Sequence, residues 1–302
     1  MGIAIIAVFL HHLCLRIDLA WHMDPFPFSF FANGNVGVDL FFFASAFGCC
    51  ASLDHNPYGH YLLKRACRIY PQYIIFLTIV FIWFFPQQSI LHKLKVSILS
   101  LSGLAPFNCF HTKLEWFIPS LLLIYVTLPF LKQIMNASKR VQSLMMISAL
   151  FSSWGLLKLE WVYWAFQCRI PVIMCGIFAY LNRNNLSYCI KLFAVMLCLS
   201  LCTKEDMLIH SMIIPLLMTS LSLVNLKSLP LYKLFSWFGR HSFEFFLAQT
   251  ITTQFVMYSY FWQTKWLSIV VIIGETALFG FLFGIWQIMF DWAKTKLLAR
   301  MI

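Results

Sequence analysis

The chain has 302 residues, of which 61% are hydrophobic and only 11% are charged, and its formal net charge is +11 at pH 7. Soluble domains average about 25% charged residues, so this chain has too few polar groups to cover a water-exposed surface. Its Lys and Arg residues are spread singly through short loops, which argues against a nucleic-acid partner and is typical of membrane topology signals. The composition therefore predicts an all-α, polytopic integral membrane protein.

Apolar runs predict about ten transmembrane helices in a single membrane-embedded domain, residues 1–302, because each span needs about 20 apolar residues. The stretch 89–106 is apolar but contains Lys93, Lys95 and Gly103, which predicts a re-entrant or interfacial segment. The larger share of the 22 Lys and Arg residues falls on one side, which predicts that both termini are cytoplasmic. The expected spans lie near residues 2–15, 36–53, 70–85, 114–131, 143–158, 169–182, 187–203, 207–226, 235–257 and 266–290.

The first run, MGIAIIAVFLHHL, ends on His11 and His12. On a helix these two side chains point about 100° apart, so they cannot both face one partner. Ionisable groups at membrane depth are usually functional; the alternative is an imidazole at the membrane interface. The run has only about 14 residues and no charged flank. We therefore expect the protein to extend upstream, with Met1 an internal residue or a misassigned start.

Asp39 follows Gly34 and Gly37 in NGNVGVDLFFFASAF. The glycines allow a tight turn or a close approach to another helix. A carboxylate there can orient a histidine of the first helix and favour its charged form. The alternative is an aspartate that simply stabilises the start of a helix.

Arg65 and Arg68 follow in LLKRACRIYP, where Pro71 is expected to begin the next span. Residues three apart share a helical face, so the two arginines can bind phosphate groups together. The alternative is a basic cluster that only anchors the topology.

Three later residues are further candidates. Glu115 lies at the entrance to a span, and Arg169 lies at the start of another. Glu244 follows His241 by three residues, on the same helical face, and is the expected partner of that histidine.

Six stretches follow one another along the chain: GIAIIAVFLHH, GNVGVDLFFFASAF, LLKRACRIYP, EWFIPSLLLIYVTLP, RIPVIMCGI and FGRHSFEFFLAQ. In this order they resemble the acyltransferase family 3 membrane proteins, which O-acylate cell-surface carbohydrates. The resemblance runs nearly end to end, and the family's arginine, glycine and late histidine are replaced here by Met1, Ala46 and Gln249.

The resemblance implies a function and a set of site residues. The family's catalytic histidine falls on His12, with Asp39 or Glu115 as the group that orients it. The paired arginines fall on Arg65 and Arg68, which would hold the phosphates of an acyl-CoA donor. Arg169 is also expected to belong to the donor site.

The implied co-substrate is acetyl-CoA, with no permanently bound cofactor and no metal. The implied acceptor is a hydroxyl group of a lipid-linked or cell-surface carbohydrate. The implied location is the bacterial inner (cytoplasmic) membrane, among membrane lipids.

A hydroxyl group is a poor nucleophile at neutral pH, and histidine is the side chain best suited to remove its proton. An acyl-histidine intermediate is an alternative route. The rival class is a non-enzymatic membrane protein, either a small-solute transporter or an inactive relic without the first-helix arginine. Paired broken helices would favour a transporter, and the sequence shows none.

Overall fold

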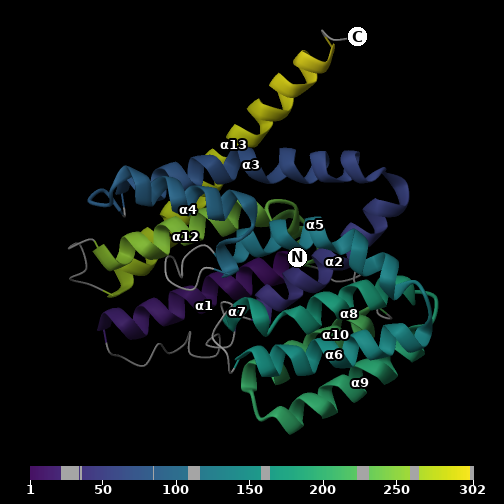
Figure 1. The fold of residues 1–302 in the computed structure, drawn as a ribbon. Helices are drawn as coiled ribbons and strands as arrows, with labels where there is room; N and C mark the ends of the chain where they lie inside the picture. The colour runs from purple at the N-terminus through teal and green to yellow at the C-terminus, as the bar shows by residue number, and fades with distance from the viewer. Residues whose placement is uncertain are drawn as a thin grey trace. The chain divides into compact units, whose positions relative to one another are not determined.

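The computed structural model is helical and contains no strand in the residues that it describes, which are 1–21, 34, 36–83, 85–107, 116–157, 164–222, 231–258 and 265–299 (Figure 1). This confirms the all-α class. The elements are α1 (Gly2–Trp21), α2 (Val36–His55), α3 (Tyr58–Trp83), α4 (Ile90–Ser102), the 3₁₀ helix η2 (Ala105–Phe107), α5 (Phe117–Met135), α6 (Lys139–Leu157), α7 (Trp164–Gln167), α8 (Ile170–Leu181), α9 (Leu186–Thr203), α10 (Asp206–Leu221), α11 (Tyr232–Arg240), α12 (Ser242–Tyr258) and α13 (Lys265–Ala299).

Within these described ranges, six helical segments are long and apolar enough to cross a membrane. Two shorter apolar helices, Gly2–Leu15 and Asp206–Leu221, accompany them. The polytopic membrane class is therefore confirmed. The six segments are Val36–His55, Tyr58–Trp83, Phe117–Met135, Trp164–Leu181, Leu186–Thr203 and Ile269–Lys296.

Two expected boundaries were wrong. Helix α3 begins at Tyr58 and runs for 26 residues, so Pro71 lies inside it and does not begin it. The expected span 235–257 is divided at His241 into α11 and α12. A proline in a helix interior removes one backbone hydrogen bond.

The stretch expected not to span the membrane forms α4, which has 13 residues. At 1.5 Å per residue this helix is about 20 Å long, less than the roughly 30 Å of a bilayer core. It ends at Gly103, which has a φ of 79° and satisfies the last carbonyl groups of the helix. Helix α4 packs against α5.

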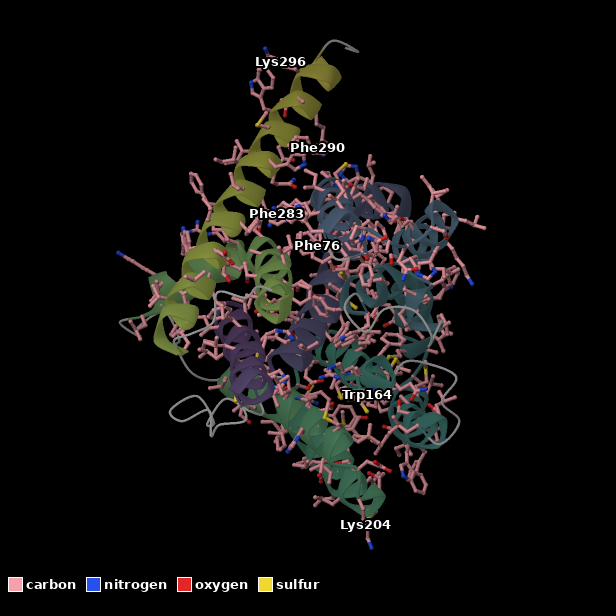
Figure 2. The ribbon with its side chains drawn as sticks, turned by 90° about the vertical axis from the view of Figure 1, so that its left-hand side faces the viewer. Phe76, Trp164, Lys204, Phe283, Phe290 and Lys296 are labelled. Carbon is pink, nitrogen blue, oxygen red and sulfur yellow. The ribbon has the colours of Figure 1, made fainter. Side chains whose placement is uncertain are left out.

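The chain forms two compact units. Unit 1 comprises Met1–Gly37, Arg65–Gln88 and Lys233–Ile302, and in it α12 packs against both α1 and α13. Its core includes Leu247, Ala248 and Ile251 of α12, which are fully buried. Lys296 lies near the outer end of α13, with its ammonium group 4.0 Å from the centre of the Trp292 ring (Figure 2).

Unit 2 comprises Val38–Lys64 and Ser89–Tyr232. Helix α8 is its central element, because α5, α6, α9 and α10 all pack against it. Of the residues in the segment Trp164–Leu181, 83% are buried, as expected of a helix that is apolar on every side. Helices α9 and α10 form a hairpin whose turn holds Lys204 in the left-handed conformation, with a φ of 55° (Figure 2).

Candidate functional site

His12 lies in the middle of α1, because that helix continues past the histidines to Trp21. His11 and His12 are both half-buried. Their ring centres are 5.6 Å apart, and the ring planes are inclined by 51°. The two imidazoles therefore diverge, as their spacing predicted.

Two glycines allow other parts of unit 1 to approach α1 closely. A Cβ atom on Gly37 would lie 2.5 Å from the Ala4 carbonyl oxygen, and one on Gly2 would lie 1.9 Å from the Phe235 carbonyl oxygen. Neither distance is possible for a real side chain. The helix that carries His12 is thus fixed at two points by backbone contacts that only glycine permits.

Arg65 and Arg68 lie one turn apart on α3, so the expected shared helix is confirmed. The Nη2 atom of Arg68 lies 2.8 Å from Oε1 of Glu244, and the Arg68 side chain remains 41% exposed. The same nitrogen donates a hydrogen bond to the Arg240 carbonyl oxygen at 3.3 Å. The Nε and Nη1 groups of Arg68 have no partner in the part of the chain that the structure describes.

A buried polar network extends this ion pair to α13. Gln72 Nε2 donates to Glu244 Oε1 at 3.3 Å and to Gln287 Oε1 at 2.9 Å. Gln287 Nε2 in turn donates to Asp291 Oδ1 at 3.2 Å. The network lies wholly in unit 1 and connects α3, α12 and α13.

The expected pairing of Glu244 with His241 was wrong, because Glu244 pairs with Arg68 instead. The His241 ring packs against Trp237, with 5.1 Å between ring centres. Sequence reasoning also missed Gln72, although it follows Arg68 by four residues and so shares its helical face.

Unit 2 contains a buried ion pair between two other candidates. Asp39 is 1% exposed and Arg169 is 2% exposed. Arg169 Nε lies 3.1 Å from Asp39 Oδ1, and Ser211 Oγ donates to the same oxygen at 3.2 Å. Arg169 Nη1 donates to the Ala165 carbonyl oxygen at 2.7 Å, and the guanidinium group lies 5.1 Å from the centre of the Trp116 ring. Each charge is therefore compensated, as a buried charge must be.

Glu115, the other expected orienting carboxylate, lies outside the described residues. The roles expected for Asp39 and Arg169 stay predictions. Ser211 gave no sequence signal, because it lies in an apolar helix like many structural serines.

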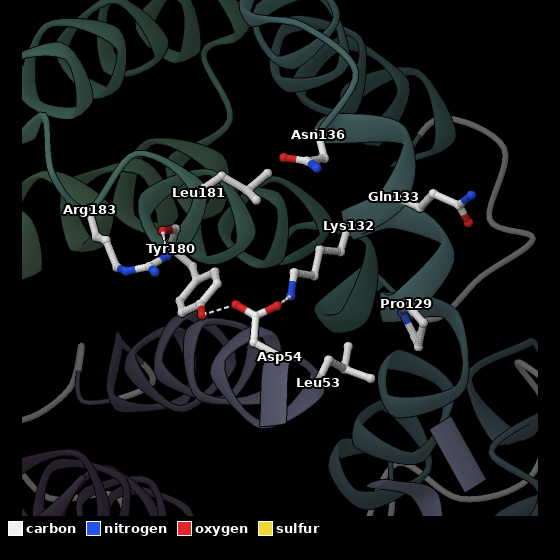
Figure 3. A pocket seen from close by; sticks show the side chains of 9 residues that line it. All are labelled: Leu53, Asp54, Pro129, Lys132, Gln133, Asn136, Tyr180, Leu181 and Arg183. Carbon is white, nitrogen blue, oxygen red and sulfur yellow. Dashed lines mark hydrogen bonds and ion pairs between the residues drawn. The ribbon is translucent and has the colours of Figure 1, made fainter. Parts of the chain in front are cut away.

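A pocket of about 420 Å³ in unit 2 contains none of the expected site residues (Figure 3). The Asp54 carboxylate accepts hydrogen bonds from the Lys132 ammonium group and the Tyr180 hydroxyl group. Lys132 and Arg183 lie at the C-terminal ends of α5 and α8, where cations stabilise a helix. We interpret this cluster as structural. The pocket is lined by Leu53, Asp54, Pro129, Lys132, Gln133, Asn136, Tyr180, Leu181 and Arg183.

Comparison with known proteins identifies the family. The family model for the acyltransferase domain matches residues 2–290. The chain belongs to acyltransferase family 3. This confirms the resemblance seen in the six sequence stretches, and it places α1 to α12 and most of α13 inside the family domain.

One curated relative of this acyltransferase family 3 protein is "Putative acetyltransferase ORF330" of Acidianus two-tailed virus, 34% identical over 112 residues. The match covers 35% of this chain and 32% of the relative, so the chain spans about a third of the length of that protein. No solved structure matches the chain. A family 3 acyltransferase needs an acyl donor and an acceptor.

Proposed function

We propose that the protein transfers an acetyl group from acetyl-CoA to a hydroxyl group of a lipid-linked or cell-surface carbohydrate. The observation that carries this proposal is the family match over residues 2–290, which includes both the helix of His12 and the arginines of α3. The relative named as an acetyltransferase favours acetyl over longer acyl groups. The chain combines a histidine that can act as the base, arginines that can bind phosphates and several membrane-spanning helices. This combination suits the proposed chemistry.

Arg65 and Arg68 are proposed to bind the phosphate groups of the donor. Glu244 fixes the orientation of Arg68, whose side chain is 41% exposed. The Nε and Nη1 groups of Arg68 can then donate to a phosphate with little further loss of side-chain entropy. Arg169 differs, because its guanidinium group is buried against Asp39; a donor phosphate would reach it only if that ion pair opened.

In the proposed reaction, His12 accepts the proton of the acceptor hydroxyl group as the oxygen attacks the thioester carbon. A C–O bond forms, and the carbonyl electron pair moves onto the carbonyl oxygen. When the carbonyl group forms again, the C–S bond breaks, and the CoA sulfur takes the proton from His12. General-base help of this kind contributes about 10²–10⁴-fold. Glu115 would orient the imidazole, because Asp39 already pairs with Arg169 in unit 2.

A covalent route through acetyl-His12 gives the same products. It predicts that the protein itself becomes labelled when it is incubated with labelled acetyl-CoA in the absence of an acceptor. The proposed location is the bacterial inner membrane with both termini in the cytoplasm, where acetyl-CoA is available.

The test uses membranes that contain the full chain and matched membranes without it. Both are incubated with radiolabelled acetyl-CoA, and glycans are then extracted and treated with mild alkali, which cleaves O-acetyl esters. The proposal predicts chain-dependent, alkali-labile label in the glycan fraction. No chain-dependent ester, together with chain-dependent uptake of a small solute, would instead identify a transporter.

A further inference from the structure

Gln249 is a fully buried side chain on α12. Neither its Oε1 nor its Nε2 atom has a partner in the described part of the chain. The large majority of buried side-chain polar atoms are bonded, because an unbonded buried amide loses its hydrogen bonds to water without replacement. Gln287 in the same unit uses both atoms of its amide group. Other buried side chains of the described residues leave at most a single atom unbonded, whereas Gln249 leaves both amide atoms unbonded, which points to a partner that binds only during function.

Gln249 does not belong to the network around Glu244. Five residues separate them on α12, which places the two side chains about 140° apart around the helix. Thr252, whose hydroxyl group lies 2.8 Å from that of Thr276, faces α13. Gln249 lies about 60° from Thr252 around the helix, on the side of Thr252 that is turned away from Glu244.

Helices α1 and α12 pack side by side in unit 1 (Figure 1). The start of α1 lies beside the end of α11, which directly precedes α12, because a Cβ atom on Gly239 would lie 3.2 Å from the Gly2 nitrogen. His12 lies about 15 Å along α1 from Gly2, and Gln249 lies about 10 Å along α12 from Ser242. These distances along two packed helices differ by about one helical turn.

We infer that the Nε2 amide of Gln249 donates a hydrogen bond to the thioester carbonyl oxygen of the acyl donor. The inference rests on the proposed acetyl transfer. As the acceptor oxygen attacks, negative charge moves onto that carbonyl oxygen, and the amide stabilises it. Gln249 neither gains nor loses a proton. The hydrogen bond from its amide to the carbonyl oxygen weakens when the C–S bond breaks.

A neutral amide suits this role at membrane depth, because a charged donor would carry a large desolvation cost there. A donor already held in a dry site needs no reorganisation when charge develops. Loss of one such donor lowers kcat by about 10²–10³-fold.

The test compares Gln249→Met, which keeps the length of the side chain but removes the donor, with Gln142→Met as a matched control. Gln142 is a buried glutamine of unit 2 whose Oε1 atom accepts a hydrogen bond from Asn182 at 2.8 Å. The full chain in membranes is assayed for kcat and for the KM of acetyl-CoA. The same variants in detergent are tested for their thermal midpoint.

For Gln249→Met we expect kcat to fall about 10²–10³-fold with little change in KM. Its thermal midpoint should stay level or rise, because an unbonded buried amide has been removed. Gln142→Met should show the opposite pattern, with a lower midpoint and an unchanged kcat. Gln249→His returns an N–H donor and should recover part of the lost rate.

A Gln249→Met protein with normal kcat overturns the inference, whatever its stability. A lower midpoint with normal kcat would show that the amide only binds a buried water molecule. A wild-type chain that transfers no acetyl group overturns both the proposed function and this role, whereas active wild type beside active Gln249→Met overturns this role alone.

Discussion

Arg68 on α3 and Glu244 on α12 form an ion pair of unequal exposure, with 2.8 Å between Nη2 and Oε1. The Glu244 side chain is 3% exposed, whereas that of Arg68 is 41% exposed. A buried carboxylate therefore fixes one edge of a guanidinium group whose other edge remains open to a ligand. This arrangement suits a phosphate-binding arginine better than a simple topology anchor, which needs no buried partner.

Glu244→Gln should raise the KM for acetyl-CoA about fivefold, equivalent to about 1 kcal/mol, because Arg68 loses its fixed orientation but keeps its charge. The kcat should change less than twofold, since Glu244 is not placed at the reacting atoms. Steady-state kinetics in membranes measure both values. Glu275→Gln on α13 is the matched control and should leave KM unchanged. An unaltered KM in Glu244→Gln would show that the ion pair does not contribute to donor binding.

Asp39→Asn should destabilise the protein by about 3–5 kcal/mol, because it leaves the Arg169 charge buried without its counter-charge. Arg169→Met should cost a similar amount for the opposite reason. Denaturant titration of the full chain in detergent measures both losses of stability.

The double variant Asp39→Leu/Arg169→Met is the control for this pair. Replacing both charges with apolar groups is often close to neutral, so the double variant should recover most of the lost stability. Additive losses in the double variant would contradict the account of Asp39 and Arg169 as a compensated pair.

Gly37→Ala should destabilise the chain by more than about 2 kcal/mol, since overpacking against a rigid backbone carbonyl has no flexible side chain to relieve it. Its new Cβ atom would lie 2.5 Å from the Ala4 carbonyl oxygen. Gly48→Ala, on the same helix, meets nothing within 4 Å. That control should be neutral or stabilise the chain by up to about 1 kcal/mol. Equal stability of the two variants would show that α1 and the start of α2 are not in this close contact.

The membrane class and the family could be predicted from the sequence because they depend on composition and on motifs in order. The shared face of Arg65 and Arg68 could be predicted too, since helical spacing is local. The partner of Glu244 could not, because Arg68 lies on another helix, whereas spacing along the chain points only to near neighbours such as His241. Local spacing cannot reveal contacts between distant helices.

The same limit applies to Asp39 and Pro71. From the sequence, Asp39 could be a carboxylate that orients a histidine or one that stabilises a helix start, and no local pattern showed that Arg169 lies beside it in unit 2. Proline often marks the start of a helix, yet α3 continues through Pro71. Trp286 on α13 donates a hydrogen bond to the Pro71 carbonyl oxygen at 3.2 Å, and no local pattern encodes that contact.

The most direct measurement of the central claim compares His12→Ala with His11→Ala in the acetyl-transfer assay. The two substitutions are chemically identical and lie on adjacent positions of α1, so they disturb the helix to a similar extent. We predict that His12→Ala lowers kcat by about 10²–10⁴-fold, while His11→Ala keeps most of the activity. A folded His12→Ala protein with wild-type kcat would contradict the assignment of His12 as the base.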